Sequence, residues 1–353
     1  MVSIRASIER IERLCAGPLD ERSLREQTLV ELRRMVGFDA YVWLTTDPVT
    51  AVGVSPLADV PTFSELPTTI RLKYLTDINR WTQLTTDEPV ALLRQATGDD
   101  PTRSLMWRDL LRRYDIGDVA SVVLADRFGT WGFLDLWRTG PEPFGPSDVE
   151  MLGAFARHLT PAIRSRQAAT FRVPRRPDAR DLGPVVIMLD DALEVVGRTE
   201  ASGAWLETLL APGAGQPVVP ASVYNVAAQL LAVEHGIDRN AARSRVHLAS
   251  GVWVTLRAAR LASQATGLSG VGVVAVTIEE TTADERAEVF ALAFGLSPRE
   301  RDVLSRLPSG GDTRRLARDL HISAYTVQDH LRSIFAKTGA PTRQALVARA
   351  TGR

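Results

Sequence analysis

The chain has 353 residues, of which 45% are hydrophobic and 24% charged, and its formal net charge is zero. This length predicts two or three domains, and the composition is that of a soluble globular protein. No run approaches 18 apolar residues, which excludes a predicted membrane span, and a single cysteine excludes an internal disulfide and any all-cysteine metal site.

Charge is distributed unevenly along the chain. Residues 295–353 contain eleven Arg and Lys residues against five Asp and Glu residues, so the remainder is acidic. Such a basic end is typical of a nucleic-acid-binding module joined to another domain, although a solvated basic helix face would give the same balance. Because the N-terminus lacks a signal pattern and Cys15 is the only cysteine, we expect a cytoplasmic protein.

The first 168 residues predict a mixed α+β domain that begins with a helix. Apolar residues recur at three- and four-residue spacing in the helical segments and alternate in the strand candidates. The expected elements are helices within 1–37, a strand at 38–46, a helical middle at 64–114, strands at 119–126 and 131–138 joined as a hairpin by RFGT, and a long helix capped by Ser147.

A second α+β region is expected after a Pro- and Arg-rich linker at 169–182. Residues 183–281 read as two short strands around an acidic turn, a helix, and three further strands, and a connecting helix follows at 282–294. The acids Asp190 and Asp191 resemble those of a phosphoacceptor receiver domain. A receiver also needs a lysine, and residues 183–294 contain none. We therefore place the acids in a β-turn, and the order of elements resembles a PAS-like sensor fold instead.

The order of elements in residues 20–168 resembles a GAF domain. This resemblance implies an α/β/α sandwich in which one sheet face and the middle helices enclose a small molecule. As a group, aromatic residues in this region could line such a pocket, although any single one is better explained as a core side chain. The candidate ligand-binding residues are Trp43, Tyr74, Trp81, Trp107, Tyr114 and Phe133.

The C-terminal residues 295–353 predict four helices. Ser297, Pro298 and Glu300 form the start signal of the first helix, and Ser323 caps the third at 324–338. The second helix, 313–320, and the third share apolar positions that would form one core between two steeply crossing helices, a pattern typical of a helix-turn-helix. These positions are Leu316, Ala317, Leu320, Ile322, Val327 and Leu331.

This segment resembles the LuxR-type helix-turn-helix domain over almost its full length. The residues that carry the resemblance are Leu296, Pro298, Arg299, Glu300, Val303, Leu304, Ala317, Leu320, Ile322, Ser323, Thr326, Val327, His330, Ile334, Lys337 and Gly339. The resemblance implies an all-α DNA-binding domain whose third helix enters the major groove. His321, where the family often has Gly, and Gln328, where it often has a basic residue, depart from the pattern.

The resemblance also implies roles for individual side chains. Contacts to phosphates or the groove wall are expected from Arg314, Arg315, Ser323, Tyr325, Thr326, His330 and Lys337, and contacts to bases from Val327, Gln328, Asp329 and Arg332. Gln suits adenine, Arg suits guanine, and Asp can only accept, as from cytosine. Alternatives are a salt bridge between Asp329 and Arg332 and a packing role for His330.

Together these patterns predict a multidomain α+β protein of five segments: a GAF-like domain at 1–168, the linker at 169–182, a PAS-like domain at 183–281, the connecting helix at 282–294, and the all-α four-helix domain at 295–353. This order resembles that of actinobacterial one-component transcription regulators. We expect a homodimer that binds a double-stranded DNA operator and responds to a small-molecule effector. The alternative is a ligand-independent regulator whose sensor folds serve as dimerisation or partner-protein scaffolds.

No catalytic constellation, metal-ligand spacing or cofactor motif is evident, so we expect no enzyme activity, metal or cofactor.

Overall fold

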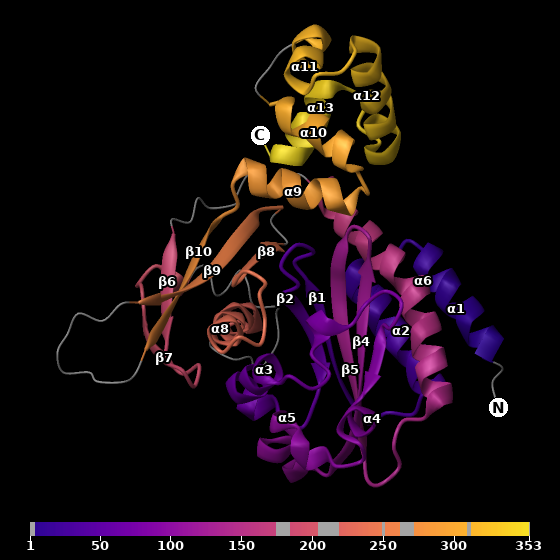
Figure 1. Cartoon of the computed structure of the whole chain (residues 1–353), viewed down its shortest axis with the longest axis vertical. Helices are drawn as coiled ribbons and strands as arrows, with labels where there is room; N and C mark the ends of the chain where they lie inside the picture. Colours follow the sequence, from indigo (N-terminus) through magenta and orange to yellow (C-terminus); the bar gives the residue numbers. More distant parts are fainter. Residues whose placement is uncertain are drawn as a thin grey trace.

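The computed structural model describes residues 4–173, 184–203, 219–248, 251–261, 272–308 and 312–352. Two five-stranded antiparallel sheets lie side by side below a group of C-terminal helices (Figure 1). No helix among the described residues is both long and apolar enough to cross a membrane. The mixed α/β architecture with C-terminal helices agrees with the fold class expected from the sequence.

The first sheet contains the predicted hairpin and two strands that the sequence pattern did not reveal. Its strands are β1 (Ala40–Thr46), β2 (Gly53–Asp59), β3 (Val90–Leu92), β4 (Ile116–Asp126) and β5 (Gly129–Thr139), in the order β2-β1-β5-β4-β3. The predicted β1 and the β4–β5 hairpin are confirmed. Strand β2 was missed because it is half exposed and contains Pro56, and β3 because it has only three residues.

Helices cover the first sheet and fill the connections between its strands. They are α1 (Ile4–Ala16), α2 (Glu21–Met35), α3 (Leu66–Leu75), α4 (Leu93–Thr97), α5 (Leu105–Asp109) and α6 (Pro146–Thr170), with 3₁₀ turns at Phe63–Glu65, Trp81–Gln83, Pro101–Arg103 and Leu111–Tyr114. Helices α1, α2 and α6 lie on the side of the sheet that faces away from the second sheet (Figure 1).

The start of α6 corrects one sequence-based expectation. The N-cap is Gly145 rather than Ser147, because Gly145 N–H donates to the Asp148 carboxylate and Pro146 occupies the first helical position. The helix runs to Thr170, so residues 169 and 170 of the expected linker are helical. Residues 174–182 of that linker lie outside the described residues.

The second sheet follows the predicted succession of strands. It comprises β6 (Val185–Leu189), β7 (Val195–Arg198), β8 (Arg243–His247), β9 (Trp253–Leu261) and β10 (Val273–Glu280), in the order β7-β6-β10-β9-β8, with α8 (Ala221–Glu234) before β8. Asp190 begins a turn between β6 and β7, and its carboxylate accepts from the N–H groups of Ala192 and Glu194. The predicted acidic β-turn is therefore confirmed.

The two sheets share one strand order. Counted from its own first strand, each sheet has the order 2-1-5-4-3, although the sequence shows no internal repeat. Helix α8 lies between the sheets and packs against α3 and β2 of the first and β9 of the second (Figure 1). Eleven of its residues are buried, as expected for a helix enclosed on all sides.

Buried ion pairs join the two sheet regions. Arg245 of β8 reaches Asp47, which follows β1, at 2.7 Å, and both side chains are completely buried. Arg80 pairs with Asp238 at 2.7 Å, and its guanidinium also donates to Gln229 of α8 at 3.0 Å. Each pair links residues more than 150 positions apart. Because the side chains of both ion pairs are buried, separating the two sheet regions would leave each charge without its ion-pair partner.

The C-terminal helices rest on this two-sheet body through one connecting helix. They are α9 (Ala283–Ala293), α10 (Pro298–Arg306), α11 (Thr313–Leu320), α12 (Ala324–Thr338) and α13 (Arg343–Thr351). Helix α9 contacts α6 below and α10 and α13 above. One buried apolar cluster extends from Ile11 through α6 and α9 to Ala350. The C-terminal helices therefore share a continuous core with the rest of the chain.

Asp47→Ala is expected to lower the free energy of unfolding by about 3 kcal/mol, because it removes the buried carboxylate of Arg245 and leaves only the half-exposed Glu288 as its ion-pair partner. Glu26→Ala is the control, since it removes an exposed ion pair with Arg22 and should change stability by less than about 1 kcal/mol. Urea unfolding followed by tryptophan fluorescence measures both. Equal losses in the two variants would contradict a special role for the buried pair.

Candidate functional site

Helices α11 and α12 form the predicted helix-turn-helix because each carries its own start signal and one shared apolar face. The Asp312 carboxylate accepts from Arg315 N–H, and Ser323 Oγ accepts from Thr326 N–H. Gly339 ends α12 in the left-handed conformation, with φ of 64°. The predicted shared core is confirmed: Leu316, Ala317, Val327 and Ile334 are buried, and Leu320, Ile322 and Leu331 pack against them.

The turn between the helices depends on His321. This residue adopts the left-handed conformation with φ of 52°, and its N–H donates to the carbonyl of Arg318 at the end of α11. Left-handed φ is uncommon for residues other than glycine. His321 thus adopts a backbone conformation that glycine adopts more readily.

Polar side chains gather on the outer face of the helix pair. On α12, Tyr325, Gln328 and Arg332 recur at three- and four-residue spacing and are exposed, and Tyr325 is 67% accessible. On α11, the predicted Arg314 and Arg315 are exposed as well, and so is Arg318, which sequence reasoning overlooked. Its spacing of four from Arg314 is the signal that could have identified it.

Two of the predicted base-contacting residues are engaged within the domain. Val327 is completely buried in the shared core, so its side chain cannot reach a base. The expectation for Val327 was wrong, because its helical spacing from Ile334 places it on the inner face. Asp329 pairs with Arg332 at 2.7 Å, as the alternative interpretation had it, and this exposed pair is readily exchanged for other partners.

Three predicted phosphate contacts lie at the margin of this face. Ser323 and Thr326 occupy the N-terminal cap, where their hydroxyl groups are 2.8 Å apart. His330 is half-buried beside them on α12. Their roles toward DNA stay predictions. Ser323 Oγ already accepts a hydrogen bond from Thr326 N–H as the cap of α12.

Lys337 forms an ion pair with Glu300. Its ammonium lies 2.6 Å from one carboxylate oxygen of Glu300 and 2.9 Å from the other. Glu300 also accepts from Ser333 Oγ and from Ser297 N–H, the latter as part of the α10 capping box. The ion pair connects α12 to α10, although the Lys337 side chain stays 37% exposed. Because its ammonium group is already bound to Glu300, Lys337 is less suited to contact a phosphate than the sequence predicts.

Hydrogen bonds change the acidity of Glu300. Burial alone would raise its pKa, but the bonds from Lys337, Ser333 and Ser297 and the charge of Lys337 lower the pKa to about 2. The ionised carboxylate is therefore the form that the folded domain holds. The sequence contained the signal for one half of this arrangement, the capping box, but not for the partner on α12.

The six aromatic residues proposed as ligand-binding do not converge on one pocket. Trp43 pairs in register with Leu134 and packs edge-on against Phe155 of α6, whereas Phe133 lies on the opposite face of the sheet and stacks on Trp81 at 4.8 Å. Directly paired residues of neighbouring strands share a face, and successive residues alternate. The predicted single aromatic-lined pocket is therefore wrong.

The other aromatic candidates also serve as structural contacts. Tyr74 is buried against Trp81 and accepts a hydrogen bond from Gly53 N–H, Trp107 Nε1 donates to the Ile116 carbonyl, and Tyr114 bonds to Glu65. A cavity of only about 20 Å³ lies nearby, and its lining includes none of the six aromatic residues. This volume holds about one water molecule.

A buried polar cluster borders that small cavity. The Lys73 ammonium lies 2.9 Å from Asp135 and 4.4 Å from the centre of the Trp81 ring, and Asp135 also accepts from Trp81 Nε1 and Ser121 Oγ. Burial lowers the pKa of Lys73, although the charge of Asp135 opposes this shift. No group of three His, Cys, Asp or Glu side chains within the described ranges is arranged to hold a metal ion.

Comparison with protein families confirms two of the resemblances. Residues 295–350 match the model described as bacterial regulatory proteins, luxR family, and residues 20–163 match the GAF domain model. The first range contains the helix pair and its supporting helices, and the second contains the first sheet.

Individual relatives cover smaller parts or are more remote. The monoamine regulon transcriptional regulator of Klebsiella aerogenes is 43% identical over 54 residues, which is 15% of this chain. The match spans 24% of that relative's length.

Among solved structures, Escherichia coli SdiA is 12% identical over 99% of this chain and 96% of its own, with a TM-score of 0.36. The chromophore-binding domain of bacteriophytochrome RpBphP3 from R. palustris is 14% identical over 46% of this chain and 61% of its own, with a TM-score of 0.32. Scores this low do not define a common fold.

Glu300→Gln is expected to destabilise the chain by about 2 kcal/mol near neutral pH, since it removes charged hydrogen bonds from Lys337. Because the folded pKa of Glu300 is depressed to about 2, the stability contributed by its ionised form is present above its ordinary pKa of 4.5 and is lost as pH falls toward 2.

The measurement for Glu300→Gln is urea unfolding of both proteins between pH 7 and pH 2. The difference in stability should shrink across the interval from about pH 5 to pH 2. Asp302→Asn serves as the control, because Asp302 makes only an exposed contact with Arg299 at 3.5 Å. A difference for Glu300→Gln that stays constant down to pH 2 would refute this assignment.

Proposed function

We propose that the chain is a DNA-binding, one-component transcription regulator in which α12 enters the major groove of a double-stranded operator. The observation that carries this proposal is the exposed row of Tyr325, Gln328 and Arg332 on α12, set beside the arginines of α11. This surface belongs to the segment that matches the luxR family model and that resembles a named transcriptional regulator. A helix of this kind fits the width of the major groove.

Different side chains of the surface suit different parts of DNA. Arg314, Arg315 and Arg318 on the scaffold helix are suited to phosphates, which supply most of the affinity but no sequence information. Gln328 and Arg332 are suited to base edges, with Gln matching adenine and Arg matching guanine. To reach a base, Arg332 must break its ion pair with Asp329. Because that pair is exposed to solvent, breaking it costs little free energy.

The active form would be a cytoplasmic homodimer. A single helix-turn-helix module buries too little surface for tight specific binding, and dimers of such modules bind two half-sites about one helical turn apart. Thr326, His330 and Ser323 at the start of α12 would then contact the backbone of each half-site. The single Cys15 is compatible with a reducing compartment.

The two sheet regions in front would control this output. The GAF match and the common strand order support a GAF-like domain followed by a PAS-like domain, as in sensory regulators of the actinobacterial type. A small-molecule effector would act by shifting the placement of the DNA-binding ends. The filled aromatic core of the first sheet favours the second candidate, in which the sheets act as a ligand-independent scaffold for dimerisation or a partner protein.

Arg314→Gln is expected to weaken binding to every duplex alike and to reduce the slope of log affinity against log salt by about 1, because one phosphate contact is lost. Gln328→Ala is expected to relax preference at one base pair, with a discrimination loss of about 1–3 kcal/mol. Fluorescence anisotropy with duplexes that the full chain selects from a random library measures both effects.

Arg239→Gln is the matched control for Arg314→Gln, because it removes the same charge from an exposed position in the second sheet region. Its affinity for DNA should equal that of the unaltered chain. If Arg314→Gln and Gln328→Ala both bound with unchanged affinity and preference, α12 would not be the DNA-reading helix.

A further inference from the structure

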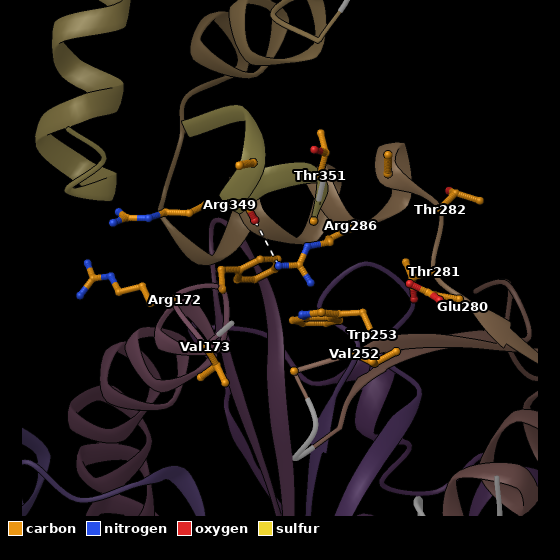
Figure 2. A pocket seen from close by; sticks show the side chains of 15 residues that line it. Arg172, Val173, Val252, Trp253, Glu280, Thr281, Thr282, Arg286, Arg349 and Thr351 are labelled. Atoms are coloured by element: carbon orange, nitrogen blue, oxygen red, sulfur yellow. Dashed lines mark hydrogen bonds between the residues drawn. The ribbon is translucent and has the colours of Figure 1, made fainter. Parts of the chain in front are cut away.

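A cavity of about 600 Å³ lies where the C-terminal helices meet the two-sheet body. Its walls come from the end of α6, from β9 and the end of β10, from α9, and from α13 (Figure 2). The volume lies within the range of pockets that bind small molecules. The cavity is remote in sequence from the predicted aromatic pocket and shares no residue with the outer face of α11 and α12.

Arg286 of α9 is the central side chain of this cavity. The residue is only 8% exposed, and its guanidinium forms no ion pair with any described residue. Its Nη2 donates to the Arg349 carbonyl at 3.2 Å, but its Nε is buried without a hydrogen-bond partner. Figure 2 shows the guanidinium above the Trp253 ring, 5.9 Å from the ring centre. A buried cation left in this state is costly unless an anion compensates it.

Other donors surround the same space. Arg172 and Arg349 also line the cavity, so its lining contains three arginines and one acidic residue, Glu280. In Figure 2 the guanidinium groups of Arg172 and Arg349 extend away from Arg286. Trp253 Nε1 is a further buried donor without a partner. Burial lowers the pKa of Arg286 to about 10, and the charge of Glu280 opposes this shift.

We propose that this cavity binds a small oxyanion, a carboxylate or a phosphate, with Arg286 as its principal partner. The planar guanidinium offers two parallel N–H groups that match the oxygens of either anion. Arg172 at the end of α6 and Arg349 on α13 would neutralise the remaining charge. The bound anion would supply the acceptors that the surrounding protein does not supply to Arg286.

The position of the cavity connects it to α12. Arg349 Nη1 donates to the Gly339 carbonyl at 3.1 Å and lies 3.5 Å from the Thr338 carbonyl, and Arg172 Nη2 lies 3.5 Å from that same carbonyl. These carbonyls end α12 and compete with an anion for the two arginines. Occupancy would therefore alter how the end of α12 is held against α6 and α13. This coupling rests on the proposed DNA-binding function, whereas anion binding does not.

Thermal unfolding of the full chain tests the site directly. Sodium phosphate and sodium benzoate are titrated against sodium chloride at constant ionic strength, and the anion that acts identifies the ligand as a phosphate or a carboxylate. We expect at least one of them to raise the melting temperature saturably. Arg286→Gln should abolish this rise, whereas Arg239→Gln, with the same loss of charge elsewhere, should retain it. The absence of a saturable rise with either anion would overturn the proposal, as would an unchanged rise in Arg286→Gln.

A second variant separates ligand recognition from folding. Arg286→Met keeps the length of the side chain but removes an uncompensated buried charge, so its melting temperature without anion should equal or exceed that of the unaltered chain. A large decrease would show that Arg286 is a structural residue and would overturn the proposal. Arg349→Gln, which leaves Arg286 in place, should weaken the anion response by about ten-fold, a charge-assisted hydrogen bond being worth about 1.5 kcal/mol or more.

DNA affinity in the presence of the active anion tests the coupling. With duplexes selected from a random library, saturating anion should change the dissociation constant by about five-fold or more, and Arg286→Gln should remove the change. A chain that binds the anion but no duplex refutes only the DNA-binding function. A chain that binds duplex but shows no saturable anion response refutes only the anion site.

Discussion

Buried charge between the two sheet regions is the constraint on which the rest of the structure depends. Arg245 with Asp47 and Arg80 with Asp238 connect segments that are distant in sequence, and all four side chains are buried. A buried pair adds little stability compared with apolar packing, but breaking it is expensive because each charge would remain unsolvated. The sheets are therefore held as one body, with α8 enclosed between them.

Above the sheets, the C-terminal helices meet this body at one joint, where α9 contacts α6 on one side and α10 and α13 on the other. The joint consists of α9 and an aromatic group in which Phe171, Trp253 and Phe290 contact one another. It also contains Arg286, whose charge lacks a carboxylate partner among the described residues. The contrast with Arg245 and Arg80 is informative, because a chain that compensates its other deeply buried arginines leaves this one beside a cavity. A site at the joint could influence the C-terminal helices without opening the sheets.

Strong local patterns allowed much of the fold to be predicted, and weak ones did not. The helix-turn-helix was predictable because Ser297 and Ser323 mark helix starts and apolar residues recur at helical spacing. The β4–β5 hairpin was predictable from its alternation. Strands β2 and β3 were not, since one is half exposed with an internal proline and the other is very short. Val327 was misassigned where a role carried over from the resemblance conflicted with its inward helical position.

By itself, the sequence determined the strongly patterned elements, their order and the polar outer face of α12, because capping and periodicity are local properties of the chain. Only the tertiary structure decided which side chains meet across large separations. The register of β1 against β5 put Trp43 and Phe133 on opposite faces, and the approach of α12 to α10 gave Lys337 to Glu300. The docking of α9 and α13 onto the sheets placed Arg172, Arg286 and Arg349 around one cavity. Such contacts arise from the packing of whole elements, which no local pattern encodes.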